Sequence, residues 1–170
     1  VPEETTAKLR ALKASGELDD TPMPALKGEA PINESVTDAQ KAAGNYPKAR
    51  THDFGKPAKI ETHAGDMRTG KGPDGTPWEV KLPYDYGYFN KTIGNDKDHI
   101  DFARPKPDAP EAGQKHFIID QRNAETGKFD EHKIFTYYGD EAAARQHYVE
   151  GFSDGKGEQR LGAITEIDRP

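Results

Sequence analysis

The sequence contains no cysteine, which excludes disulfide bonds and zinc sites built on thiolates. This absence fits a reducing compartment, and we expect a cytoplasmic protein. No run of apolar residues approaches the ~20 that a membrane-spanning helix needs, so we predict no contact with a membrane. The first residues, VPEETTAKLR, show neither the apolar core of a signal peptide nor an initiator methionine. We therefore expect a fragment or a processed product. We also expect the chain to be part of a larger multidomain protein or to form a homo-oligomer.

The chain also has fewer basic than acidic residues, with 24 Lys and Arg and 30 Asp and Glu, which gives a net charge of −6 at pH 7. This balance argues against non-specific binding to nucleic acids, which requires a surplus of positive charge. It leaves open a site that binds anions through a metal ion. Hydrophobic residues make up only 32 % of the 170 residues, so we predict one domain with polar extensions rather than two domains.

Aromatic residues are missing from residues 1–44. Two short helical patterns, at residues 5–16 and 35–44, flank a proline-rich polar stretch that is typical of a linker. Helices this short are marginal in water by themselves. We therefore predict a polar N-terminal extension over residues 1–44, which docks loosely on a domain at residues 45–170 or wraps around it.

The remainder of the chain alternates turn signals with short patterns typical of strands. These patterns lie at residues 57–65, around 78–80, and at 99–103, 114–122, 129–138 and 161–167. A helix is expected from Asp140, its N-cap, to a stop near Gly151. Many short strands and one late helix predict an α+β domain that is mainly β, a small barrel of OB-like type with flanking helices. We expect Trp78 to pack that barrel.

The stretch DKDHID places Asp96, Asp98 and Asp101 within six positions. It is not a calcium loop of the EF-hand type, because Ile100 and Asp101 stand where that loop needs an oxygen ligand and a glycine. A solvated acidic turn would by itself explain the charges. The alternative is a site for Mg²⁺ or Mn²⁺, because these ions prefer oxygen ligands and cancel the repulsion between carboxylates.

Because bound magnesium is often accompanied by phosphate, a magnesium site predicts nearby groups that hold phosphate oxygens. Basic residues near predicted strand ends and two tyrosine hydroxyls qualify by chemistry. They are Arg68, Lys71, Lys81, Lys91, Lys97, Lys133, Tyr86 and Tyr88. A single lysine or tyrosine is more often a surface or packing residue, so no one of them identifies a site.

The stretch LPYDYGYFNKTIGNDKDHID, residues 82–101, resembles the core motif of the soluble Mg²⁺-dependent (family I) inorganic pyrophosphatases. That family carries Y-P-x-N-Y-G-Y-I-x-x-T, followed shortly by D-x-D-x-x-D. The chain departs from the motif at Leu82, which stands in place of the first tyrosine, and at Lys97, His99 and Ile100, which stand between the aspartates. The matching positions are Pro83, Tyr86, Gly87, Tyr88, Thr92, Asp96, Asp98 and Asp101.

A looser resemblance extends over residues 45–167. It is closest to compact, divergent pyrophosphatase-like domains inside large proteins of phages and other mobile elements. It rests on AGNY, on the R-x-G and G-x-x-W steps at residues 68–78, on Asp120 and Gln121, and on residues 126–133. The arginine that usually precedes the tyrosine motif has no clear match, and Lys81 or Arg68 is expected to cover its role.

The resemblance implies Mg²⁺-dependent hydrolysis of pyrophosphate, with Mn²⁺ as an alternative cofactor. It implies that Asp96 and Asp101 bind metal. A third metal ligand is expected from a later strand, with Asp130 favoured by motif and Asp120 as the competing choice. Asp98 is expected to orient or deprotonate the attacking water.

The same resemblance implies further roles around the substrate. Tyr86 is grouped with Asp98 as catalytic and also contacts phosphate. Glu61 is expected to act through water on a metal or a lysine, and Tyr148 is expected to support the site from behind. The expected phosphate-binding residues are Arg68, Lys81, Lys133, Tyr86 and Lys156.

Two other functions remain open on the sequence. One is hydrolysis of another diphosphate, such as a nucleotide or an RNA-end triphosphate, which would need a wall on which a base can stack. The other is a non-catalytic module that kept the fold to bind a metal or a partner. Leu82 and the unmatched arginine favour this second alternative.

Overall fold

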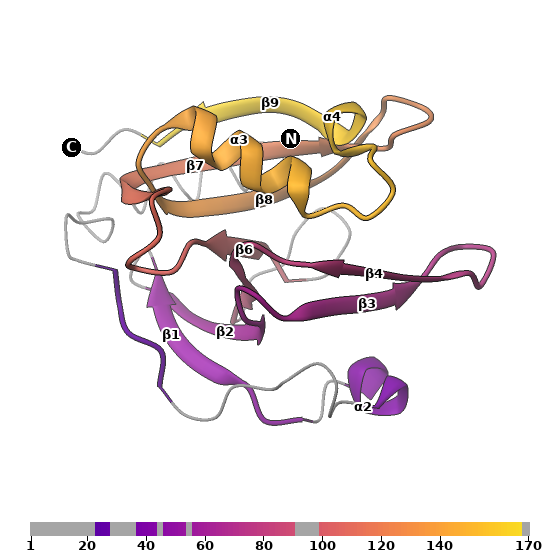
Figure 1. Cartoon of the computed structure of the whole chain (residues 1–170), viewed down its shortest axis with the longest axis horizontal. Helices are drawn as coiled ribbons and strands as arrows, with labels where there is room; N and C mark the ends of the chain where they lie inside the picture. Colours follow the sequence, from indigo (N-terminus) through magenta and orange to yellow (C-terminus); the bar gives the residue numbers. More distant parts are fainter. Residues whose placement is uncertain (1–22, 28–36, 44–45, 54–55, 91–98, 168–170) are drawn as a thin grey trace.

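The computed structural model describes residues 23–27, 37–43, 46–53, 56–90 and 99–167. Over these residues the chain is mainly β, with a mixed sheet and short helices (Figure 1). The elements are α2 (Asp38–Ala43), β1 (Ala49–Asp53), β2 (Lys56–Thr62), β3 (Met67–Lys71), β4 (Pro77–Lys81), β5 (Asp85–Phe89), β6 (Asp101–Arg104), β7 (Ala112–Arg122), β8 (Phe129–Tyr138), α3 (Glu141–Glu150), α4 (Gly157–Arg160) and β9 (Leu161–Glu166).

Seven strands form one sheet in the order β1-β2-β5-β6-β8-β7-β9. Its pairs are antiparallel except for β6 and β8, which run parallel. Strands β3 and β4 form a separate hairpin, which extends to the right in Figure 1 between α3 above and α2 below. Among the described strands β1 and β9 do not pair, so closure into a barrel of OB-like type stays a prediction.

The residues in the middle of β7 are buried on both faces of the sheet, where they contribute to two hydrophobic clusters. Phe117, Ile118 and Ile119 are consecutive and buried, so side chains that alternate along the strand fill two core clusters. Ile118 packs with Phe102 and other residues on one face, while Phe117 and Ile119 pack on the face that α3 covers. Each such side chain, when fully buried, stabilises the fold by about 1.5–3 kcal/mol.

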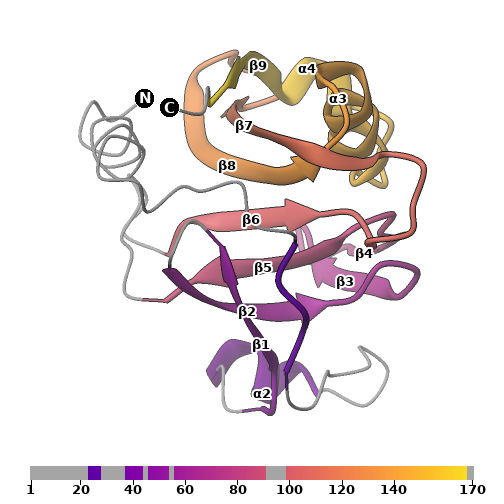
Figure 2. The ribbon, with the colours of Figure 1, turned by 90° about the vertical axis from the view of Figure 1, so that its left-hand side faces the viewer.

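The predicted late helix is confirmed as α3. Asp140 caps it, because its carboxylate accepts a hydrogen bond from the Ala143 N–H at 2.8 Å, and Gly151 forms the C-cap. Ala144 and Tyr148 are buried against the sheet. Helices α3 and α4 lie at one end of the molecule and α2 lies at the other (Figure 2). Within the described ranges, every helix is too short or too polar to cross a membrane.

Part of the N-terminal extension lies along the domain. Lys27 forms an isolated antiparallel bridge with Arg50 of β1, and Leu26 packs against the core. The second predicted helix is present as α2, and Thr37 and Gln40 cap its start reciprocally. The helix predicted at residues 5–16 lies outside the described residues. The boundary near residue 44 stays a prediction.

Candidate active site

Three neighbouring strands, β5, β6 and β8, bring polar side chains together on one face of the sheet. Tyr88 of β5 lies opposite Asp101 of β6, and Asp101 lies beside Lys133 of β8. Tyr86 points to the same face as Tyr88, because side chains alternate along a strand. Gly87 between them permits this pairing, since a Cβ there would collide with the backbone of β2. The tyrosine motif, the end of the acidic stretch and Lys133 therefore meet in space.

Lys133 lies at the centre of a hydrogen-bonded network, and it is only 9 % exposed. Its ammonium donates to the Tyr86 hydroxyl at 2.5 Å and to Asp101 Oδ2 at 3.1 Å. It also forms an ion pair with Glu131 Oε1 at 2.7 Å. The Tyr86 hydroxyl in turn donates to Asp101 Oδ2 at 2.5 Å. A buried cation is tolerated here because several oxygen atoms surround it.

The network fixes the protonation states of two of its members. Burial alone lowers the pKa of Lys133, but the oxygen atoms around it, first that of Tyr86 and then the two carboxylates, raise this pKa well above its usual value. Burial, followed by the charge of Asp101, also raises the pKa of the Tyr86 hydroxyl far above its usual value. At neutral pH Lys133 is therefore a cation, and Tyr86 is a neutral hydrogen-bond donor.

A cavity of about 280 Å³ opens over this network. It combines three carboxylates, one guanidinium, two phenols and one imidazole, which is the chemistry of a site for an anion that arrives with cations. The lining residues are Glu61, Arg68, Tyr86, Tyr88, His99, Asp101 and Glu131. Four of the residues that the sequence predicts for the site, Glu61, Arg68, Tyr86 and Asp101, thus line one cavity, with Lys133 directly beneath it.

The charges in the cavity are compatible with a divalent metal ion. Burial, and after it the negative charge of Asp101, raises the pKa of Glu61. A bound cation would reduce the repulsion between these two carboxylates. The carboxylate oxygens are the donors that Mg²⁺ and Mn²⁺ prefer. Within the described ranges, no three carboxylate or imidazole groups lie close enough to hold one ion. Asp96 and Asp98, which the sequence assigns to metal and water, lie outside the described residues.

The hairpin β3–β4 supplies the guanidinium. Arg68 on β3 lines the cavity, and its guanidinium carbon lies 4.9 Å from the centroid of the Tyr86 ring. Lys81, the other expected substitute for the unmatched arginine, is exposed on β4 and is absent from the cavity lining. Leu82 is 1 % exposed within a core cluster, so this departure from the tyrosine motif changes packing rather than the cavity surface.

The acid that the structure brings to the cavity from a later strand is Glu131. Asp130 is exposed, and its carboxylate accepts a hydrogen bond from Gln121 Nε2 at 3.0 Å. Asp120 pairs with His132, at 2.9 Å, on the face of β8 opposite to Lys133. The sequence alone could have indicated Glu131. Side chains alternate along a strand, so Glu131, two residues before Lys133, lies on the same face of β8 as Lys133.

Tyr148 supports this acid from behind. It is buried on α3, and its hydroxyl donates to Gln121 Oε1 at 2.9 Å. Gln121 Nε2 lies 3.5 Å from Glu131 Oε1 as well as bonding Asp130. Lys156, predicted as a phosphate ligand, is exposed just before α4 and does not line the cavity.

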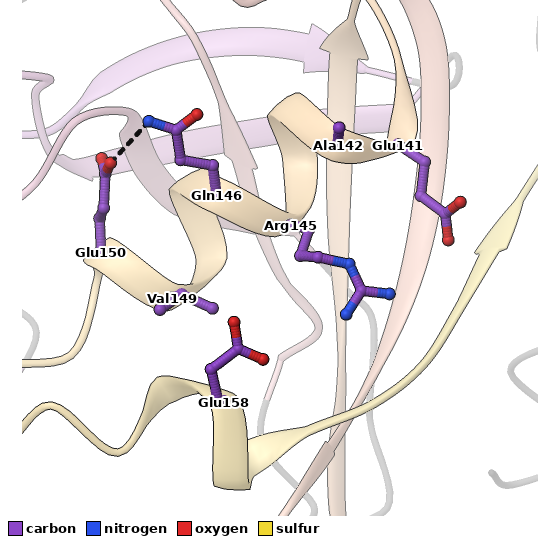
Figure 3. Close-up of a pocket in the computed structure, with 7 residues that line it drawn as sticks. All are labelled: Glu141, Ala142, Arg145, Gln146, Val149, Glu150 and Glu158. Carbon is purple, nitrogen blue, oxygen red and sulfur yellow. Dashed lines mark hydrogen bonds between the residues drawn. The ribbon is translucent and has the colours of Figure 1, made fainter.

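A second cavity, of about 470 Å³, lies between α3 and α4 and shares no residue with the first (Figure 3). It is lined by Glu141, Ala142, Arg145, Gln146, Val149, Glu150 and Glu158. Gln146 donates to Glu150 along the same helix at 2.9 Å, and Glu158 of α4 points toward α3. The second cavity is an open groove on the helix surface, whereas the first lies over the buried Lys133 network, so the greater volume of the second does not make it the candidate site.

Comparison with known proteins agrees with a site that binds a phosphate-containing anion. The family model described as Inorganic Pyrophosphatase matches residues 38–169. Neither the search of curated proteins nor the search of solved structures gave a match. The matched range contains every described residue of the cavity and of the network.

Proposed function

Because the chain belongs to the inorganic pyrophosphatase family, we propose that it hydrolyses inorganic pyrophosphate to two phosphates with Mg²⁺ as its cofactor. The observation that carries this proposal is the network of Tyr86, Asp101 and Lys133 beneath a cavity that also holds Arg68. The combination of two fixed cationic side chains with several carboxylates suits a diphosphate bound together with divalent cations.

The proposed metal-holding groups are Asp96, Asp101 and Glu131. Glu131 takes the role first expected of Asp130 or Asp120, because Glu131 lines the cavity and those two carboxylates lie elsewhere. When bound, the divalent cations acidify a water molecule and neutralise charge on the diphosphate. Glu61 lies in the same cavity, where its raised pKa supports a role near the cations.

The chain's own side chains divide the remaining tasks. Asp98 accepts the proton of the attacking water, whose oxygen bonds to one phosphorus while the bridging P–O bond breaks and the second phosphate leaves. Arg68 binds phosphoryl oxygens through charge-assisted hydrogen bonds. Lys133, whose three N–H groups are engaged by Tyr86, Asp101 and Glu131, contributes positive charge next to the cavity. Tyr86 donates its hydroxyl hydrogen bond and holds Asp101 and Lys133 in place, because its raised pKa makes it a donor and not a base.

A second candidate substrate is an organic diphosphate such as a nucleotide. The rings of Tyr88 and His99 stack at 4.9 Å with 18° between their planes, and both residues line the cavity. Such a wall suits a base. The volume of about 280 Å³ favours the smaller inorganic ion, because sites for organic ligands usually measure about 300–1,000 Å³.

One assay separates these candidates. Phosphate release is measured from pyrophosphate and from adenosine diphosphate, each with Mg²⁺ and with a chelator. We expect release from pyrophosphate only, and only with Mg²⁺. Preferred release from the nucleotide, sensitive to His99→Ala, would favour the second substrate. Release from neither substrate would favour the non-catalytic module.

A further inference from the structure

The only tryptophan of the chain contacts the predicted phosphate-binding arginine. Trp78 lies on β4 opposite Gly70 of β3, and its indole covers that glycine so closely that a Cβ there would collide with it. The Arg68 guanidinium carbon lies 5.3 Å from the centroid of the Trp78 ring and 4.9 Å from that of Tyr86. Trp78 belongs to neither core cluster, so it does not pack the core as the sequence suggested.

The two aromatic rings are what hold the guanidinium. Within the described part of the chain, the side chain of Arg68 forms neither an ion pair nor a hydrogen bond, while it contacts both rings. The ring faces attract the cation through their quadrupoles, and a planar guanidinium stacks on them without using its N–H groups. The carboxylates of Asp101 and Glu61 attract the guanidinium from a longer distance, and the two rings are the groups that contact it directly.

We infer that Trp78 is a positioning residue, which acts through Arg68 to prepare the guanidinium for binding a diphosphate. This inference rests on the proposed function. An arginine side chain has several rotatable bonds, and ordering it on binding reduces affinity. Contact with Trp78 orders the side chain before the ligand arrives. Gly70 permits this contact, because only a residue without Cβ lets the indole lie across β3.

A double-mutant cycle tests this role by equilibrium binding, without turnover. The ligand is methylenediphosphonate with Mg²⁺, which cannot be hydrolysed at its bridging carbon. The variants are Trp78→Leu, Trp78→Phe, Arg68→Ala and the double variant Arg68→Ala with Trp78→Leu. Glu79→Gln, an exposed neighbour on β4, is the control for general changes in the hairpin. The melting temperature of each variant shows that it is folded.

We expect Trp78→Leu to weaken binding by about 3–10-fold, the worth of a partly buried cation–π contact. Trp78→Phe should retain most of the affinity, and Glu79→Gln should bind as the wild type does. In the Arg68→Ala background, Trp78→Leu should cause no further loss, because the two residues act as one unit. With pyrophosphate as substrate, KM should rise while kcat changes little.

Tryptophan fluorescence gives a second readout, because Trp78 is its only source. Saturating diphosphonate should change the emission of the wild type and leave that of Arg68→Ala unchanged. Equal losses from Trp78→Leu in both backgrounds, or no loss in either, would overturn the inference. A wild type that binds the diphosphonate but releases no phosphate from pyrophosphate would overturn the proposed reaction and leave this role of Trp78 in place.

Discussion

Lys133 is a buried cation that its neighbours keep charged, and the site is arranged around it. The neighbours contribute one hydroxyl and two carboxylates, from Tyr86, Asp101 and Glu131. Breaking such a buried pair by removing one partner typically costs about 3–5 kcal/mol, because the other charge is left uncompensated. Substitutions that keep shape and remove charge are therefore the informative ones at this site.

Glu131→Gln is such a substitution, and Asp130→Asn is its matched control on the same strand. We expect Glu131→Gln to reduce metal affinity or turnover by about 10–100-fold, as changes around metal ligands usually do. Asp130→Asn should leave both within about twofold, because Asp130 is exposed and outside the cavity. The measurement is phosphate release across a Mg²⁺ titration. The reverse ranking of the two variants would show that the third ligand is Asp130, as the motif first indicated.

At this scale the assignment of site residues stays a prediction, and the structure shows which of the predicted residues line one cavity. The resemblance placed Arg68, Tyr86, Asp101 and Lys133 at the site, because each lies in or near a short ungapped motif. It missed Glu131 because motif matching favoured the adjacent aspartate, whereas the alternation of side chains along β8 decides which of the two faces the cavity.

At the scale of elements, local signals predicted local structure. The Asp140 cap and Gly151 delimit α3, and the strand predicted at residues 129–138 coincides with β8. Strand β1 was missed, because its sequence ARTHD is short and polar. The parallel pairing of β6 with β8 was not predictable, since it joins strands separated by the whole of β7 and is set by long-range packing.

His116 links β7 to the end of β8 and makes the stability of the sheet depend on pH. Its Nδ1 accepts a hydrogen bond from the Tyr137 N–H at 3.1 Å, and burial lowers the pKa of His116 to about 4. The folded state therefore prefers the neutral ring, whose pKa is about 6.5 when unfolded. This contribution is fully present above pH 6.5 and is lost as the pH falls toward 4, with a total of about 3 kcal/mol at most.

Urea unfolding between pH 7 and pH 4 measures this effect. His116→Gln keeps an acceptor and removes the titration, so its free energy of unfolding should fall less steeply with acid than that of the wild type. The other histidines remain in both proteins. The difference between the two slopes of unfolding free energy against pH therefore reports the contribution of His116. Identical slopes would mean that protonation of His116 is not linked to unfolding.

At the scale of the whole molecule, the division into a polar extension and a β domain stays a prediction. Leu26 packs on the core and Lys27 pairs with Arg50, so part of the predicted extension contributes to the fold. The absence of aromatic residues from residues 1–44 correctly drew attention to a change in composition. It could not reveal which segment docks, because one leucine at a sheet edge leaves no periodic pattern.

Two truncations test where the folding unit begins. Removal of residues 1–22 should leave the free energy of unfolding within about 0.5 kcal/mol, because this segment has no aromatic residue to contribute to a core. Removal of residues 1–27 should cost about 1–3 kcal/mol, because it also exposes the surface that Leu26 covers. Denaturant unfolding of both proteins decides the matter. Equal stability of the two would assign no structural role to residues 23–27.

Divalent cations should stabilise the folded protein as a whole. A ligand that binds only the folded state adds about 2.7 kcal/mol at 100 times its Kd, so Mn²⁺ should raise the melting temperature in a concentration-dependent way. Asp101→Asn should weaken this response, since it removes one proposed ligand and part of the charge that raises the pKa of Glu61. A melting temperature indifferent to millimolar Mn²⁺ in both proteins would argue against a cation site.

The proposed roles of the two aspartates are tested most directly by comparing Asp98→Asn with Asp101→Asn in the Mg²⁺-dependent release of phosphate from pyrophosphate. The wild type should release phosphate only with Mg²⁺. Asp98→Asn should lower turnover by about 10²–10⁴-fold, the usual worth of a positioned base, with little change in Mg²⁺ affinity. Asp101→Asn should instead need more Mg²⁺, and excess Mg²⁺ should partly restore its rate. Near-normal turnover by Asp98→Asn, or no Mg²⁺-dependent release by the wild type, would contradict the account.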